Sequence, residues 1–316
     1  MLNKIGIILL LFFLLTGCGQ APSRGNLEKV GLLVPETIND QVWGTMGYKG
    51  LLKIQSKMNV DVFYKEGMDT EFEVKQAVEE FHKKGVNLIF GHGNEYQAFF
   101  RELKDQYPDI HFVFFNGDAK GPNVTSLNFN SHAMGFFAGM VASHMSKTNK
   151  VGIIAAFEWQ PEVEGFYQGA TYEKEDVHVE IRYIFSWYNV DRALKELDDL
   201  IHQNVDVVYP AGDVYNVPVI EHLKDRGLYA IGYISDQADL GEQTVLTSTV
   251  QHVDKLYLLV AERFNSGKLE GGNLFFDFQD GVISMGKYSP LVDQPFQEKI
   301  HNFIERYRET GKLPNE

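Results

Sequence analysis

The chain has 316 residues, a formal net charge of −14 at pH 7, 44% apolar residues and one cysteine. An excess of acidic residues argues against direct binding of DNA or RNA, because contacts with phosphates need clustered Lys and Arg side chains. A single cysteine also excludes an intramolecular disulfide.

The first 18 residues have the pattern of a lipoprotein signal. Lys4 precedes an apolar stretch, residues 5–15, which ends in Leu-Thr-Gly-Cys at 15–18. This stretch is too short to span a bilayer as a helix, which takes about 20 residues. We therefore predict a signal peptide over residues 1–17, a lipid (palmitate-containing) anchor on Cys18 and a location on the extracytoplasmic face of the cell membrane. An uncleaved anchor, or an ordinary signal peptide with a chance cysteine, is the alternative.

The remainder is long enough for two lobes. Cleavage before Cys18 leaves 299 residues, and the formal charge becomes −15 because the removed segment carries only Lys4. Residues 18–28 are rich in small and polar side chains and are predicted to be a tether. A typical domain has about 100–200 residues, so we expect the rest to form two lobes.

Short runs of β-branched and aromatic residues alternate with amphipathic stretches. The expected strands are residues 29–34, 60–64, 88–91, 111–115, 124–129, 150–156, 177–185, 205–210, 229–233 and 245–250, with late strands at 273–278 and 282–286. A typical helix covers 71–84, with Phe72, Val74, Ala77, Val78 and Phe81 on one stripe. Repeated strand–helix units of about 30 residues predict parallel sheets with helices on both faces. An eight-stranded parallel barrel is an alternative at this length.

The series of strand–helix units breaks near Asn130. The next segment, 131–147, is a predicted helix with Gly135 and Gly139, a spacing found in membrane helix dimers but also suited to close packing within a lobe. We favour close packing, because His132, His144 and Lys147 interrupt the segment. A final helix is expected at 296–307. Returning elements suit two lobes joined by several crossings: lobe 1 from 29–130 plus about 247–285, and lobe 2 from 131–246 plus about 286–316.

The loops after the strands hold the candidate ligand-binding residues. In open parallel sheets, ligands bind beyond the carboxyl ends of the strands. The loops there carry aromatic residues (Trp43, Trp159, Phe166), carboxylates (Asp40, Glu95, Asp213, Asp236) and amides (Asn39, Asn94, Gln160, Gln237). Such a set suits a neutral, polar, ring-bearing ligand, because rings stack and carboxylates accept hydrogen bonds from hydroxyls. Alternatively, Asp40 and Asp236 cap helices, and Trp43 and Phe166 are core residues.

Patterns typical of enzymes are missing from the sequence. It contains no Gly-x-Ser-x-Gly, no His-Glu-x-x-His, no phosphate loop ending in Gly-Lys-Ser/Thr and no complete Gly-x-Gly-x-x-Gly. The ten His residues lack metal-ligand spacing, and His92 between two glycines is typical of a loop. We therefore expect no catalytic residue, no metal and no cofactor.

Several stretches together resemble a known family. They are Gly-His-Gly-Asn-Glu-Tyr at 91–96, Ala-Gly at 138–139 with Met-Ser-Lys-Thr-Asn-Lys-Val-Gly at 145–152, Pro-x-Val-x-x-Phe-x-x-Gly-Ala at 161–170, Tyr-Ala-Ile-Gly-Tyr-Ile-Ser-Asp-Gln at 229–237, and Val-Leu-Thr-Ser-Thr-Val at 245–250. From about Lys29 onward the chain resembles the basic membrane protein (BMP) family of substrate-binding lipoproteins. The PnrA branch of that family binds purine nucleosides between two lobes of a type I periplasmic-binding-protein fold. Residues 38–44 and 209–220 look particularly similar to a branch that regulates competence genes.

The resemblance implies part of a binding site. Family members place an aromatic residue in a pattern like Asp-x-Ser-Phe-Asn, which Trp43 after Asp40 resembles, although Gly44 stands where that Asn belongs. The second stacking aromatic resembles Phe166, the acidic residue before Gln resembles Asp236, and the family's lysine position is Gln251. The predicted ligand-binding set is therefore Asp40, Trp43, Glu95, Phe166, Asp213, Asp236 and Gln251.

The resulting functional expectation is an extracytoplasmic, lipid-anchored protein that closes its lobes on a nucleoside-like small molecule. The resemblance implies a positive regulatory role in competence and an ABC transporter or membrane signalling protein as partner. The alternative is a ligand-free signalling or protein-interaction lipoprotein that has kept the binding-protein fold.

Overall fold

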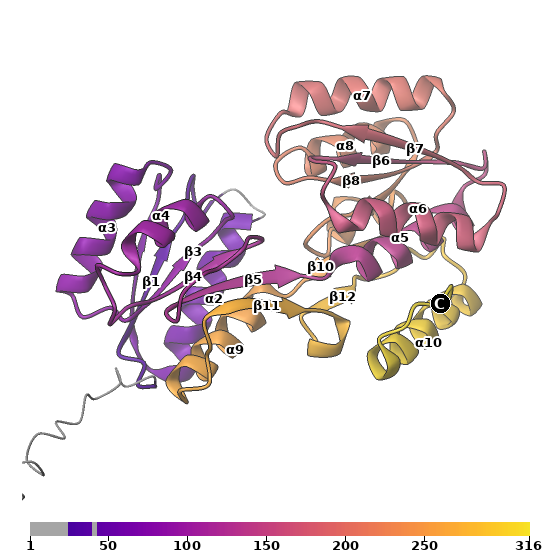
Figure 1. Ribbon diagram of the computed structural model, residues 1–316. Coiled ribbons are helices and arrows are strands. Elements are labelled where there is room, and N and C mark those ends of the chain that lie inside the picture. The colour runs from indigo at the N-terminus through magenta and orange to yellow at the C-terminus, as the bar shows by residue number, and fades with distance from the viewer. Residues whose placement is uncertain (1–24, 40–42) are drawn as a thin grey trace, which may run out of the picture.

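The computed structural model describes residues 25–39 and 43–316, which form two α/β lobes (Figure 1). Cys18 and Asp40 lie outside the described residues, so their predicted roles in lipidation and ligand binding have no structural account here. Within the described ranges, no helix combines the length and the apolar character needed to cross a membrane.

Lobe 1 is a six-stranded, wholly parallel sheet between two helix pairs. The strand order is β11-β5-β4-β3-β1-β2. Its strands are β1 (Lys29–Leu33), β2 (Asp61–Lys65), β3 (Leu88–Gly91), β4 (His111–Phe115), β5 (Val124–Phe129) and β11 (Gly272–Phe276). One face is covered by α2 (Trp43–Met58) and α9 (Val253–Asn265), the other by α3 (Glu71–Lys83) and α4 (Tyr96–Leu103). On α3, Val74, Ala77, Val78 and Phe81 are buried as predicted, but Phe72 is 69% exposed, because it lies off that stripe.

Lobe 2 repeats this plan with the order β12-β10-β9-β8-β6-β7. Its strands are β6 (Lys150–Ala155), β7 (His178–Tyr183), β8 (Val207–Ala211), β9 (Tyr229–Gly232), β10 (Val245–Gln251) and β12 (Ile283–Met285). One face is covered by α5 (Ser131–Met145) and α6 (Pro161–Glu173), the other by α7 (Val190–His202) and α8 (Asn216–Asp225). The remaining elements are the short 3-10 helices η1 (Ala238–Leu240) and η2 (Phe278–Asp280) and the C-terminal helix α10 (Gln294–Thr310). The strand β12 pairs antiparallel with β10, the one departure from parallel pairing among the described strands.

Three crossings join the lobes within the described residues. They lie at Asn130, at His252 and along residues 277–282, and hydrogen bonds tie them together. The backbone N–H of Asn130 donates to the carbonyl oxygen of Phe276 at 2.9 Å, and that of His252 donates to Val282 at 2.7 Å. The lobe boundaries in the C-terminal part of the chain differ from those predicted. All of β10 and β12 belong to the sheet of lobe 2, and only residues 253–276 belong to lobe 1. Two open sheets also exclude the closed barrel.

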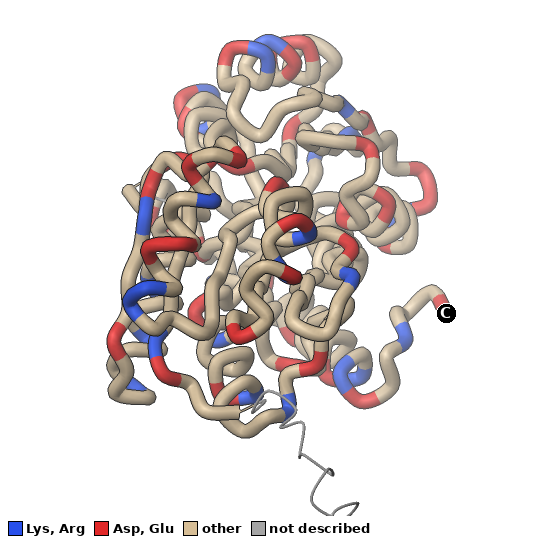
Figure 2. The backbone as a smooth tube through the Cα atoms, turned by 60° about the vertical axis from the view of Figure 1, so that its left-hand side comes forward, with Lys and Arg blue, Asp and Glu red and all other residues tan. Residues whose placement is uncertain are grey.

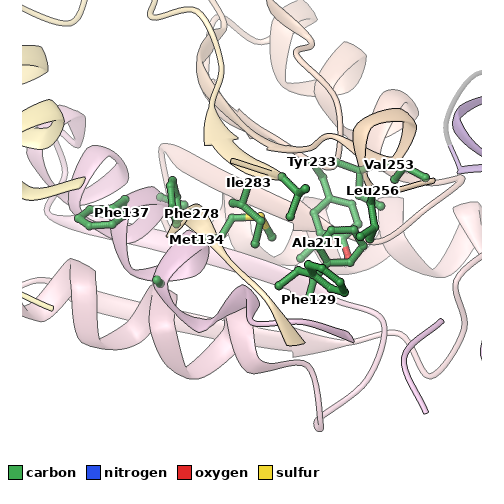
Figure 3. Close-up of a cluster of buried hydrophobic side chains, with 14 of the residues drawn as sticks. Phe129, Met134, Phe137, Ala211, Tyr233, Val253, Leu256, Phe278 and Ile283 are labelled. Carbon is green, nitrogen blue, oxygen red and sulfur yellow. The ribbon is translucent and has the colours of Figure 1, made fainter. Parts of the chain in front are cut away.

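The core is continuous across these crossings. Figure 3 shows part of the shared cluster, in which side chains from α5, α9, η2 and β12 pack around the ends of β5 and β8. Smaller cores lie beneath α3 and α4 in lobe 1 and beneath α7 and α8 in lobe 2. The buried apolar side chains of this shared cluster thus pack against the ends of the strands that precede the cleft loops.

Glycines bring α5 and α6 into close contact. A methyl group at Gly139 would overlap the carbonyl oxygen of Phe166, and one at Gly169 would overlap the carbonyl oxygen of Phe136. Gly135 and Gly165 face backbone atoms of the opposite helix in the same way. The Gly135–Gly139 spacing therefore serves close packing within lobe 2, as predicted.

Candidate ligand-binding cleft

A cavity of about 280 Å³ lies between the lobes at the carboxyl ends of their strands. Loops after β1, β3 and β4 line it from lobe 1, and loops after β6, β7, β8 and β9 line it from lobe 2. Gln251, the last residue of β10, lies beside the crossing at His252 and also lines it. The position is the one expected for ligands of open parallel sheets.

Trp43, at the start of α2, forms an aromatic wall in lobe 1. Its ring stacks on His92 with centroids 4.3 Å apart and planes 11° from parallel. The indole N–H donates to the carbonyl oxygen of His92 at 3.1 Å, and Nε2 of His92 donates to the carbonyl oxygen of Trp43 at 2.7 Å. A carbonyl can only accept, so we assign an imidazole proton to Nε2, while Nδ1 is hydrogen-bonded to the Tyr257 hydroxyl at 2.9 Å.

Glu95 is the carboxylate that lobe 1 contributes. It directly precedes α4, and its carboxyl group occupies the space that a side chain on Gly93 would fill. Burial raises the pKa of Glu95 above its ordinary value, with an opposing contribution from its own backbone N–H. The carboxylate of Glu95 can therefore occupy this position because residue 93 is a glycine.

Lobe 2 contributes a buried polar group around Glu162, which is only 3% exposed. Glu162 lies in the first turn of α6, where Pro161 starts the helix. Its Oε1 accepts from Nε2 of Gln160 at 2.8 Å and from the Tyr233 hydroxyl at 3.1 Å. Asp213, in the loop between β8 and α8, is a second buried carboxylate lining the cavity from this lobe.

Three aromatic rings form a second wall on lobe 2. The ring centroids of Phe157, Trp159 and Trp187 lie 5.4–5.9 Å from one another. Trp159 and Trp187 line the cavity, and Trp159 is 55% exposed. These rings offer stacking surface across the cleft from Trp43.

Four of the predicted site residues meet in the cavity: Trp43, Glu95, Asp213 and Gln251. Phe166 does not line it, because it lies one turn deeper on α6 than Glu162 and is fully buried against Tyr209, with ring centroids 5.7 Å apart. Asp236 also lies outside the lining. Its carboxylate accepts from the backbone N–H groups of Ala238 and Lys287, so it links the turn before η1 to the segment after β12.

Sequence reasoning missed several lining residues, namely Asn116, Asn128, Glu162, Trp187, Tyr188, Tyr233 and Phe275. Trp187 and Tyr188 follow β7 and were detectable by the rule that located the other loops. Phe275 had no such signal, because it lies within β11 and not in a loop that follows a strand. No sequence signal pointed to Glu162, because acidic residues are common in the first turn of a helix whether or not they bind a ligand.

Residues 27–316 match the protein family described as ABC transporter substrate-binding protein PnrA-like. The chain belongs to this family. The BMP/PnrA-like resemblance drawn from the strand-end motifs is thereby confirmed, and the family is one of substrate-binding proteins.

Individual proteins and solved structures are also similar to the chain. The chain is 56% identical to the transcriptional activator protein Med of Bacillus subtilis over 314 residues, 99% of each chain. It is 52% identical to the structure of a transcriptional activator of the comK gene from Bacillus halodurans, with a TM-score of 0.86, over 90% of this chain and 99% of that one. A solute-binding protein of an Aeropyrum pernix ABC transporter shares the fold at 20% identity, with a TM-score of 0.71, over 91% of this chain and 81% of the other. The predicted two-lobed periplasmic-binding-protein fold is thus confirmed.

Proposed function

We propose that the protein is an extracytoplasmic, lipid-anchored binding protein that closes its lobes on a small, ring-bearing, nucleoside-like molecule. The observation that carries this proposal is the cavity itself, which has Trp43 on lobe 1, Trp159 and Trp187 on lobe 2, and carboxylates and amides among the rings. Rings that stack and polar groups that orient are the usual components of a small-molecule site. Neither lobe supplies both walls, so binding favours closure.

The second part of the proposal is a positive regulatory role in competence gene expression. It is supported by the similarity to Med, which is named a transcriptional activator. In the view of Figure 2, Lys and Arg positions are scattered among Asp and Glu positions, and the whole chain carries a formal charge of −14. Such a surface is poorly suited to DNA. We therefore propose that regulation passes through a membrane partner, either an ABC transporter or a signalling protein, with Cys18 holding the chain at the membrane.

A specific observation also favours the ligand-free signalling alternative. The indole N–H of Trp43 is already bonded to His92, and Phe166, which the resemblance implies as the second stacking ring, lies in the core. A cavity organised by its own contacts can persist after a ligand is lost. The two functions differ in one measurable respect, the response to small molecules.

Thermal unfolding of the full chain with a panel of nucleosides tests the proposal. A ligand that binds only the folded state raises the melting temperature with concentration. We expect Trp159→Ala to abolish this rise and Phe72→Ala, which truncates an exposed aromatic residue on α3, to leave it intact. No shift with any nucleoside would favour the signalling alternative.

A further inference from the structure

The charged side chains that line the cleft all carry the same sign. Glu95 comes from lobe 1, and Glu162 and Asp213 come from lobe 2; no Lys or Arg side chain lines the cavity within the described residues. Residues 40–42 lie outside that part, but their sequence, Asp-Gln-Val, contains no cationic residue. The cavity therefore concentrates negative charge where water is partly excluded.

His92 also lines the cavity, and hydrogen bonds within lobe 1 hold its imidazole ring in place. Its Nε2 donates to the carbonyl oxygen of Trp43, and its Nδ1 is hydrogen-bonded to the Tyr257 hydroxyl. Both ring nitrogens are therefore already engaged by other groups of lobe 1. His92 thus serves to orient Trp43.

Helix ends and neutral donors compensate Glu95 and Glu162 only in part. Glu95 directly precedes α4, and Glu162 lies in the first turn of α6. A helix N-terminus carries about half a positive charge, and its effect fades within one turn. Both hydrogen bonds to Glu162 come from uncharged groups and go to one oxygen. Desolvation of a carboxylate is costly unless a full opposite charge lies nearby.

Aromatic faces in the same cavity favour a cation independently of the carboxylates. Trp43, Trp159, Trp187 and Phe275 line it, and the last is 68% exposed. The face of an aromatic ring is electron-rich and attracts a positive charge, most strongly for tryptophan. A flat ring that carries a positive charge would satisfy both the rings and the carboxylates.

We infer that the cleft selects ring-bearing ligands with a positive charge and rejects anionic ones such as nucleotides. The inference rests on the proposed function, because it assumes that the cleft binds a small molecule, and it adds the charge of that molecule. A cation placed between Glu95 on one side and Glu162 and Asp213 on the other attracts both lobes. Ligand charge therefore also favours the closed state.

Calorimetry on the purified full chain with four compounds tests the inference. They are 1-methyladenosine, N6-methyladenosine, adenosine and adenosine 5′-monophosphate. 1-Methyladenosine is cationic at neutral pH, whereas its isomer N6-methyladenosine and adenosine are neutral, so the isomers differ in charge at equal composition of heavy atoms. We expect 1-methyladenosine to bind at least about tenfold more tightly than N6-methyladenosine. Adenosine 5′-monophosphate should bind at least about tenfold more weakly than adenosine.

Two variants link the preference to the cavity. Glu95→Gln should reduce the ratio between the isomers severalfold, whereas Glu175→Gln, the same change at an exposed position on lobe 2, should leave it unchanged. Equal or tighter binding of the neutral compounds would overturn the charge preference and leave the proposed function intact. Absence of binding by all four compounds would overturn the proposed function and this inference with it.

Discussion

The indole of Trp43 and the imidazole of His92 hold each other in place through a stack and two reciprocal hydrogen bonds to backbone carbonyls. The arrangement joins the first turn of α2 to the end of β3. The hydroxyl of Tyr257, from α9, is hydrogen-bonded to Nδ1 of the imidazole and holds the ring in place. The aromatic wall of lobe 1 is therefore held in position before any ligand enters.

Gly47 provides the space for this arrangement, and Gly47→Ala should disturb it. The added methyl carbon would lie 2.7 Å from the imidazole ring of His92, so the ring must shift. We expect unfolding free energy to fall by about 1–3 kcal/mol, as for overpacked cores, and ligand affinity to fall with it. Ser56→Ala, on the exposed side of the same helix, is the control. Unchanged stability in urea denaturation would show that His92 has room to move.

Trp43→Ala and Phe166→Ala should have opposite consequences. Trp43 lines the cavity, so its truncation should weaken ligand binding by about 30-fold, equivalent to about 2 kcal/mol. Phe166 is fully buried beside Tyr209, so its truncation should lower the unfolding free energy by about 3–5 kcal/mol. Affinity should stay near that of wild type in the fraction of Phe166→Ala that remains folded. Calorimetry and denaturation of both variants make the comparison, and the reverse pattern would return Phe166 to the site.

The contact between α5 and α6 should be intolerant of a single methyl group. In Gly169→Ala, the new carbon overlaps the backbone oxygen of Phe136, which cannot rotate away as a side chain would. We expect a loss of at least about 1–3 kcal/mol in unfolding free energy. Glu164→Ala, exposed on the same helix, should change stability by less than about 0.5 kcal/mol. Similar denaturation midpoints for the two variants would mean that α5 and α6 can move apart without loss of stability.

Glu95 should make stability depend on pH. Burial raises its pKa in the folded state, so the unfolded chain ionises first as the pH rises. Its destabilising contribution is absent below the unfolded pKa, about 4.3, and complete above the folded pKa. Glu95→Gln should therefore be more stable than wild type at pH 7, and this advantage should disappear at pH 4. Denaturation at both pH values measures the difference, and an advantage that persists at pH 4 would contradict this cause.

Cys18 is the predicted lipid-attachment residue, and Cys18→Ala tests it directly. The variant should be released from the membrane fraction or remain unprocessed, because Cys18 is the only cysteine in the chain and no other thiol can carry the lipid. Metabolic labelling with a fatty-acid probe measures the modification. Equal labelling of the variant and the wild type would refute the prediction.

Much of the architecture was predictable from hydrophobic periodicity. The strands Leu88–Gly91, His111–Phe115 and Val124–Phe129 have the bounds expected from the sequence, because each is a largely buried run rich in apolar residues and ended by polar or small ones. Site residues that immediately follow such strands, including Glu95 and Asp213, were accessible for the same reason. Parallel strands bring their carboxyl ends to one edge whatever the loops contain.

What the sequence determined by itself was therefore the periodic part: the strand–helix alternation, two lobes, and the edge at which a ligand would bind. Tertiary structure alone decided how deep each side chain lies and to which lobe the late elements return. Phe166 and Glu162 are four residues apart on one helix, yet one enters the core and the other reaches the cleft. The local sequence does not show which of the two positions reaches the cleft, because that depends on how the loops and the other lobe lie around the helix. The order of the crossings likewise follows from long-range pairing of β10 with β9 and β12, which no local pattern encodes.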